Sequence, residues 1–205
     1  MPDFSFMRRN DGSHARDGLR NISSTLLLLI SAPIIAILLT SHVFQSYQVD
    51  GQSMETTLQN GDRLIVLKLP KTIANISRGT YMPNRYDIVV FDRPPQSAIS
   101  ANVEHLIKRV IALPGERVSI RDGRVTVYND EYPDGFNPDV NQEHSEAVSV
   151  TEGQVDITVS EGEVFVLGDN RFNSTDSRKF GSIDTDSIVG TAELRFVPVS
   201  KMKKL

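Results

Sequence analysis

One serine in this chain has the surroundings of a candidate nucleophile. Ser53 lies in the glycine-containing stretch Asp50-Gly51-Gln52-Ser53-Met54-Glu55-Thr56-Thr57-Leu58, between a long apolar run and a strand-like run. A serine hydroxyl is a poor nucleophile at neutral pH and needs a base within hydrogen-bond reach. The chemistry to consider is therefore covalent catalysis by an activated serine, and another residue must supply the base.

Lys108 is the more suggestive base. It lies in Leu106-Ile107-Lys108-Arg109-Val110-Ile111, where the period-two alternation of a strand places it on one face with two aliphatic residues. A lysine with the ordinary pKa of ~10.4 is protonated at neutral pH and cannot accept a proton. Burial among apolar side chains can lower this pKa by ~3 units or more, which makes the amine a general base. On composition alone, an edge-strand lysine that reaches solvent remains the alternative.

The histidines offer a second choice of base, and a metal site is the other chemistry they could support. His14, His42, His105 and His144 are widely scattered, and no pair has the i, i+4 spacing of a helical metal site. Residue types alone leave a Ser-His-Asp triad open, but the chain has no Gly-x-Ser-x-Gly motif. We expect neither a metal nor another cofactor.

A second polar cluster, Gly168 to Gly181, follows an apolar run and is rich in hydrogen-bonding side chains. It does not fit a calcium loop. An EF-hand loop needs glycine at its sixth position and glutamate at its twelfth, whereas a count from Asp169 reaches Ser174 and Phe180. We expect this cluster to support the lysine instead, with Ser174 holding the amine and an Asp176–Arg178 pair bracing the loop.

The elements that position these residues begin with an apolar segment. Residues 22–44 carry no Asp, Glu, Lys or Arg and are long enough to cross a bilayer as a single helix, with a kink at Pro33. A buried core helix would show a polar stripe, and a cleaved signal would end in a small-x-small site, which is not evident here. The sequence therefore predicts an uncleaved transmembrane anchor.

The charges that flank this segment predict its orientation. Residues 1–21 are polar, read as a disordered tail, and contain four arginines, while no Lys or Arg follows the segment until Arg63. The positive-inside rule places the tail in the cytoplasm and residues 45–205 outside it. The net charge of −4 argues against a general nucleic-acid binder, and without cysteine there is no disulfide and no thiol nucleophile.

Residues 45–205 read as a mostly β domain of short strands separated by turns. An Asp122-Gly123 turn predicts a hairpin between two alternating runs. Residues 70–84 read as a polar connector, and about 122–160 as a small excursion rich in loops. The predicted strands are 45–50, 63–67, 86–91, 105–113, 118–120, 125–127, 164–167 and 188–197.

Together these residues resemble type I signal peptidases, the membrane-bound Ser-Lys endopeptidases that remove signal peptides. Four blocks occur in the family's order and, with the anchor, cover roughly residues 22–197. They are Gly51-x-Ser53-Met54-x-x-Thr57-Leu58, Gly61-Asp62-Arg63, Tyr86 to Phe91 with Ile107-Lys108-Arg109-Val110-Ile111-Ala112-Leu113-Pro114-Gly115, and Gly168-Asp169-Asn170-Arg171 continuing to Arg178. The resemblance implies the signal-peptidase/LexA-like β fold and the short form of the family.

The resemblance also implies roles for individual residues. Ser53 would be the nucleophile and Lys108 the general base, with Ser174 orienting the lysine. The remaining members of the last block would be supporting residues, namely Asp169, Asn170, Arg171, Asp176 and Arg178. The oxyanion hole would use the Ser53 backbone N–H and the Gly51 region. Thr56 stands where the family usually has proline, which would stiffen the turn by fixing φ.

The function that follows is cleavage of exported preproteins after small-x-small sites of the Ala-x-Ala kind, at the outer face of the cell membrane and close to the export translocon. Two alternatives stay open. One is a LexA-type self-cleaving Ser-Lys protease. The other is an inactive, membrane-anchored homologue that binds export substrates.

Overall fold

The structure is a computed structural model that describes residues 12–77, 79–93, 104–140 and 150–205. The chain divides into two compact units, Met1–Ser41 and His42–Leu205, and each is described by itself.

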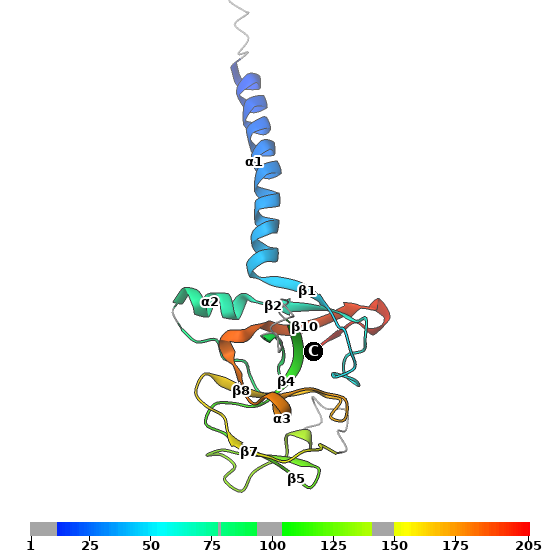
Figure 1. Ribbon diagram of the computed structural model, residues 1–205. Helices are drawn as coiled ribbons and strands as arrows, with labels where there is room; N and C mark the ends of the chain where they lie inside the picture. Colours follow the sequence, from blue (N-terminus) through cyan, green and yellow to red (C-terminus); the bar gives the residue numbers. More distant parts are fainter. Residues whose placement is uncertain (1–11, 78, 94–103, 141–149) are drawn as a thin grey trace, which may run out of the picture. The chain divides into compact units, whose positions relative to one another are not determined.

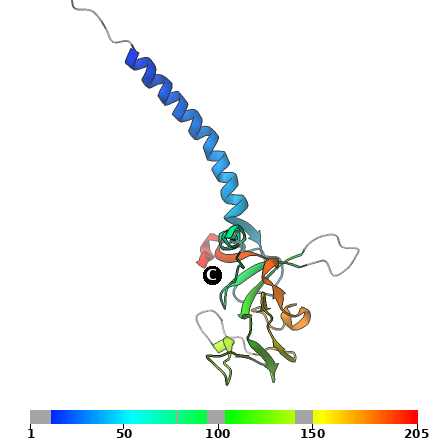
Figure 2. The ribbon, with the colours of Figure 1, turned by 90° about the vertical axis from the view of Figure 1, so that its left-hand side faces the viewer.

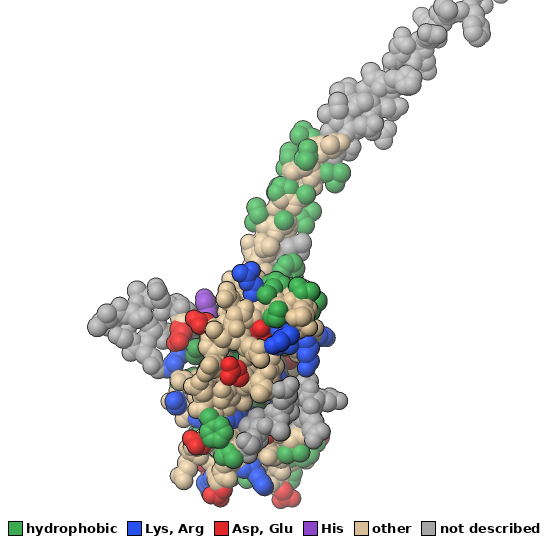
Figure 3. All heavy atoms as spheres, turned by 90° about the vertical axis from the view of Figure 1, so that its right-hand side faces the viewer, with side chains coloured by type: hydrophobic (Ala, Val, Ile, Leu, Met, Phe, Trp, Pro, Cys, Tyr) green, Lys and Arg blue, Asp and Glu red, His purple; other side chains and the backbone are tan. Residues whose placement is uncertain are grey.

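The described part of the first unit is a single helix. Helix α1 spans Gly12–His42 and contains Pro33, so it begins before residue 22, the predicted start of the anchor. Residues 1–11 of the predicted tail lie outside the described residues. The window Thr25–His42 is long and apolar enough to cross a membrane, with a mean hydropathy of 2.0 and no buried residue. Figure 3 shows exposed hydrophobic side chains on the part of this helix whose side chains are described.

The second unit is built on an antiparallel sheet with the order β1-β2-β10-β3-β4-β8-β9, in which β11 also pairs with β10 (Figure 1). The mostly β prediction is therefore confirmed. Its strands are β1 (Phe44–Gln48), β2 (Arg63–Leu67), β3 (Ile88–Arg93), β4 (Glu104–Ala112), β8 (Glu163–Leu167), β9 (Ile183–Asp184), β10 (Ile188–Val197) and β11 (Lys203–Lys204).

A smaller sheet has the order β6-β5-β7, with β5 over Arg117–Arg121, β6 over Arg124–Tyr128 and β7 over Val155–Thr158. The predicted hairpin between β5 and β6 is confirmed. Both turn residues have positive φ, 53° at Asp122 and 75° at Gly123, as a type I′ turn requires. Figures 1 and 2 show this sheet at the end of the unit away from β1 and β2.

Strand β4 contributes residues to different hydrophobic clusters at its two ends. Ile111 and Ala112 pack with the small sheet, around Val118, Ile120 and Phe165. Ile107, nearer its start, packs against a cluster that contains Met54, Leu58, Leu64 and Val90. A third cluster lies around Phe91, Val166 and Ile188. The residues flanking Lys108 are therefore fixed by packing in both directions along the strand.

Two regions differ from the prediction. The connector 70–84 contains helix α2, Leu69–Ser77, because Pro70 is tolerated in the first turn of a helix although it reads as a breaker. The excursion contains β7 and the short 3-10 helix η1, Pro138–Val140, and residues 141–149 lie outside the described residues. The other short helices are α3 (Ser177–Phe180), η2 (Thr185–Ser187) and η3 (Val199–Lys201).

Candidate active site

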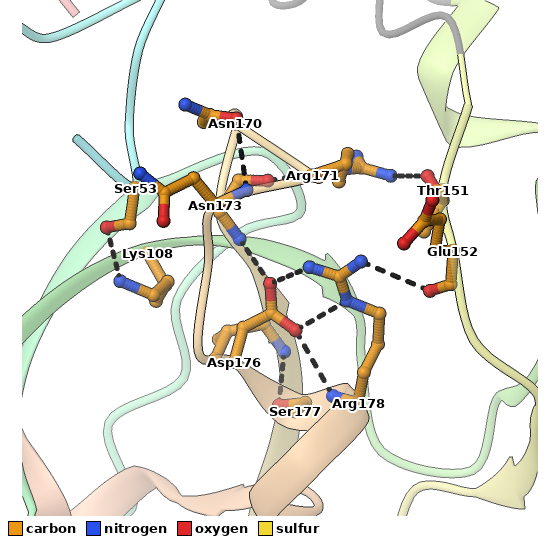
Figure 4. A network of polar contacts seen from close by, with 12 residues as sticks. Ser53, Lys108, Thr151, Glu152, Asn170, Arg171, Asn173, Asp176, Ser177 and Arg178 are labelled. Atoms are coloured by element: carbon orange, nitrogen blue, oxygen red, sulfur yellow. Dashed lines mark hydrogen bonds and ion pairs between the residues drawn. The ribbon is translucent and has the colours of Figure 1, made fainter.

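Ser53 and Lys108 lie in direct contact, although 54 other residues separate them in the sequence. The Lys108 Nζ donates to Ser53 Oγ at 2.7 Å and to the Ile107 carbonyl at 2.8 Å (Figure 4). The turn after β1 presents the hydroxyl and strand β4 presents the amine. Ser53 is half-buried, so a substrate can reach it, whereas the lysine is only 2% exposed.

The environment of Lys108 favours the neutral amine. Burial lowers the pKa of this lysine from 10.5 to about 8, although the negative charges of Asp176, Glu104 and Asp169 act in the opposite direction. Desolvation dominates because the ammonium loses water without gaining a carboxylate in direct contact. At neutral pH an appreciable fraction of the amine is therefore able to accept a proton.

The turn that carries Ser53 is held by its own side chains and backbone. Met54 and Leu58 are buried at 1% and 0% exposure, and the Leu58 N–H donates to the Met54 carbonyl at 2.8 Å. Gly51 has φ of 105°, a conformation that favours glycine, and its N–H donates to Asn60 Oδ1 at 3.0 Å. Because this N–H is already engaged, the expected oxyanion hole rests on the Ser53 N–H.

The loop after β8 clamps the same turn. The Asn170 N–H donates to the Ser53 carbonyl at 3.0 Å, and the Asn170 Nδ2 donates to the Gln52 carbonyl at 3.1 Å. A Cβ atom on Gly168 would lie only 2.4 Å from the Ser53 carbonyl oxygen. Glycine is therefore required where the loop passes the nucleophile.

Ser174 does not make the predicted contact with the lysine. Its hydroxyl is buried and does not bond to Lys108, whose two acceptors are Ser53 and Ile107; the hydroxyl acts on Asp176 instead, where it helps to lower the pKa of the carboxyl. Ser174 Oγ lies close to Gly168 instead, since a Cβ there would be 2.3 Å from it. Sequence spacing placed the serine in the correct loop but could not give its rotamer.

Asp176 and Arg178 form a buried ion pair at 2.8 Å. Asp176 also accepts the Gly168 N–H at 3.0 Å and caps α3 by accepting the Arg178 N–H at 3.2 Å (Figure 4). Burial would raise the pKa of this carboxyl, but the bonds from Arg178 and Gly168 outweigh it and hold the pKa below its usual value. The pair thus fixes the loop that passes Ser53.

Asp169 has a partner that we did not predict from the sequence. Arg109 donates to both carboxylate oxygens of Asp169 at 2.8 and 2.7 Å, and to the Tyr86 carbonyl at 2.9 Å. Its side chain points to the face of β4 opposite Lys108, as the alternation predicted. The signal was available, because two adjacent cations in an apolar strand cannot both be left without partners.

Two further arginines support the site from a distance: Arg171, which the resemblance had named as a supporting residue, and Arg195, which the sequence analysis did not single out. Arg171 donates to Asp139 Oδ2 at 3.0 Å and to Thr151 Oγ1 at 2.6 Å, which ties the loop to the excursion. Arg195 in β10 donates to the Thr57 carbonyl at 2.8 Å and to Asp62 Oδ2 at 3.3 Å. Asp139 and Arg195 stand far from the motif blocks, so their spacing gave no indication of these contacts.

Comparison with known proteins shows the family of the chain. The family described as "Signal peptidase, peptidase S26" matches residues 22–197. The Signal peptidase I of Bacillus licheniformis is 33% identical over 179 residues, which cover 86% of this chain and 89% of that protein. A probable signal peptidase I-1 of Synechocystis sp. is 35% identical over 188 residues, which cover 90% of this chain and 87% of that protein.

A solved structure of a signal peptidase I from Enterococcus faecalis is 32% identical and covers 55% of this chain and 98% of its own, with a TM-score of 0.35. The family match covers most of the chain, and two relatives exceed 30% identity over most of its length. The chain therefore belongs to the signal peptidase family S26, and it is a serine endopeptidase of the type I signal peptidase group.

Proposed function

We propose that this chain removes signal peptides from exported preproteins by a Ser53–Lys108 dyad. The observation that carries the proposal is the 2.7 Å bond between the hydroxyl and an amine whose pKa burial has lowered. An ordinary surface lysine would be almost wholly protonated at neutral pH and could not activate serine. Family membership and the geometry of the site thus support the same reaction.

In the first half of the reaction, neutral Lys108 accepts the Ser53 proton as the hydroxyl oxygen attacks the scissile carbonyl carbon. The Ser53 N–H donates to the developing oxyanion. The Lys108 ammonium then gives its proton to the leaving amine, and the peptide bond breaks to form an acyl-enzyme. In the second half, a water molecule loses a proton to Lys108 and attacks the ester carbonyl; the ester bond breaks, Lys108 returns the proton to Ser53 Oγ, and the signal peptide leaves with a new carboxyl end.

The substrate would bind as an added strand. Strand β4 pairs with β3 over its whole first half, but β8 pairs only with Arg109–Ala112. Within the described residues, the β8-side edge of β4 before Lys108 is therefore open to an extended peptide. A small-x-small segment laid between this edge and the stretch Asp50–Gln52 would bring its scissile carbonyl to Ser53.

We further propose that residues 22–44 anchor the enzyme once in the cell membrane, with residues 1–21 in the cytoplasm and 45–205 on the outer side. This orientation follows from the arginines that precede the apolar segment. It places the catalytic domain on the side where exported chains emerge, close to the translocon. Protease protection in sealed vesicles tests it, since a protease added to the cytoplasmic side must remove the tail and spare the domain.

The dyad is tested with the full chain in detergent and a model preprotein, with the cut located by mass spectrometry. Ser53→Ala and Lys108→Ala should each abolish cleavage. Ser160→Ala and Lys179→Ala change exposed residues of the same types and should retain it. Cleavage that persists in either dyad variant contradicts the proposal.

The same preparation separates the alternatives. A serine-directed fluorophosphonate probe should add its mass to the peptide that contains Ser53. Preprotein binding without a cut and without labelling would indicate an inactive binder of export substrates. Intramolecular cleavage without a second substrate would indicate a LexA-type self-cleaving protease.

A further inference from the structure

Helix α2, Leu69–Ser77, has its polar and apolar faces in an unusual arrangement. None of its residues is buried, and Leu69, Ile73 and Ile76 are 39%, 56% and 79% exposed. These three residues follow the spacing i, i+4, i+7 and therefore share one face of the helix. An amphipathic helix of a water-soluble domain would turn this face toward the core.

The opposite face of α2 is the one that meets the protein. The Lys71 Nζ donates to the Asp186 carbonyl at 2.7 Å and to the Ile188 carbonyl. The helix thus contacts the start of β10 through a lysine. The helix is fixed in this rotation by the ammonium, so the apolar face cannot turn inward without leaving two carbonyl acceptors unpaired.

The start of α2 is tied to the residues at which the apolar segment ends. Thr72 Oγ1 donates to the His42 carbonyl at 3.0 Å, and the Lys68 N–H donates to the Val43 carbonyl at 2.7 Å. His42 is the last residue of the stretch that is long and apolar enough to cross a membrane. If that stretch spans the bilayer, α2 is fixed next to the point at which the chain leaves it.

We propose that the Leu69/Ile73/Ile76 face of α2 lies in the headgroup region of the phospholipid bilayer, as a second membrane contact of the catalytic domain. The proposal rests on the proposed membrane anchor. The lysine of α2 is bonded to the protein, so the face that the helix presents outward is the aliphatic one, and helices that lie in the interface plane bury such a face at the headgroup boundary. Continuity with the anchor favours lipid over a second protein, because α2 cannot move far from the bilayer surface.

Site-directed spin labelling of the full chain tests this contact. The chain contains no cysteine, so a single introduced cysteine reports one site. Ile76→Cys carries the label on the proposed lipid face, and Asn75→Cys is the matched control, because it is also exposed and points about 100° away around the helix. Leu29→Cys reports on the anchor. Each variant is placed in nanodiscs of phosphatidylcholine and phosphatidylglycerol.

We expect the label at position 76 to collide with a water-soluble nickel chelate several-fold less, and with oxygen more, than the label at 75. Equal nickel accessibility at the two positions overturns the proposal. So does dipolar broadening at position 76 that disappears on dilution with unlabelled chain, which would indicate a second copy. A water-accessible label at position 29 would refute the anchor and the proposal with it. Preprotein cleavage by the same samples tests the dyad separately.

Discussion

The lowered pKa of Lys108 predicts how the rate depends on pH. With a pKa of about 8, the neutral fraction is roughly 0.1 at pH 7, 0.5 at pH 8 and 0.9 at pH 9. Since only the neutral amine accepts the Ser53 proton, kcat/KM should rise about tenfold from pH 7 to pH 9 and level off. A lysine with the usual pKa of 10.5 would instead give a rise of roughly a hundredfold with no plateau in this range.

The assay is cleavage of an internally quenched peptide with an Ala-x-Ala site, at substrate concentrations well below KM. Under these conditions kcat/KM reports the ionisation of the free enzyme. The peptide should contain no group that titrates between pH 6 and 10, and circular dichroism at each pH confirms that the chain stays folded. Ionic strength is held constant, because it changes the influence of nearby carboxylates.

One variant tests the cause of the midpoint. Glu104 is exposed, and its charge raises the pKa of Lys108. Glu104→Gln should therefore move the midpoint to lower pH without abolishing activity. A flat profile, a rate that falls with rising pH, or a midpoint near the usual lysine value would each refute the assignment of Lys108 as the base.

Three further predictions concern stability and the shape of the site. Gly168→Ala should abolish cleavage, because its Cβ would lie 2.4 Å from the Ser53 carbonyl oxygen, whereas Gly79→Ala should be tolerated, since its nearest contact is 3.5 Å. Asp169→Asn should lower the free energy of unfolding by about 3 kcal/mol, measured in urea, since it leaves the buried Arg109 charge without its partner. The surface variant Asp156→Asn should change stability little. Lys108→Met should be inactive but more stable at pH 7, by on the order of 3 kcal/mol from a pKa lowered to about 8, because the folded state no longer buries an ammonium. This gain should shrink as the pH rises from 8 to 10.5, where the wild-type folded chain loses its proton before the unfolded chain does.

The features of the fold that the sequence predicted well are those with a strong local pattern. The apolar run, the Asp-Gly hairpin and the strand around Lys108 each depend on neighbouring residues only. Helix α2 was missed because Pro70 and Gly79 read as breakers of secondary structure, although Leu69, Ile73 and Ile76 follow helical spacing. Strand β7 was missed because its alternate residues are exposed, so it lacks the apolar run of a buried strand.

In the candidate site, too, the features with a local sequence pattern were predicted, and those that depend on long-range contacts were not. The alternation of β4 placed Lys108 and Arg109 on opposite faces, and the structure agrees. The contacts of Ser174 and Arg195 depend on rotamers and on how distant segments meet, which no spacing in the chain encodes. The pairing of Ser53 with Lys108 came from the resemblance to type I signal peptidases, because the residues alone showed only that a serine nucleophile needs a base and that a buried lysine can be one.

Arg195 links the carboxy-terminal segment to the nucleophile. Its Nε donates to the Lys201 carbonyl at 2.9 Å while its Nη1 holds the Thr57 carbonyl, and the Lys201 Nζ donates to Gln59 Oε1 at 2.7 Å. Proteolytic trimming of the chain before residue 201 would remove the two contacts that Lys201 makes, one with Arg195 and one with Gln59. A preparation clipped there would thus lose turnover while every group that touches the scissile bond stayed in place, so intact mass should be checked before a low specific activity is attributed to the catalytic residues.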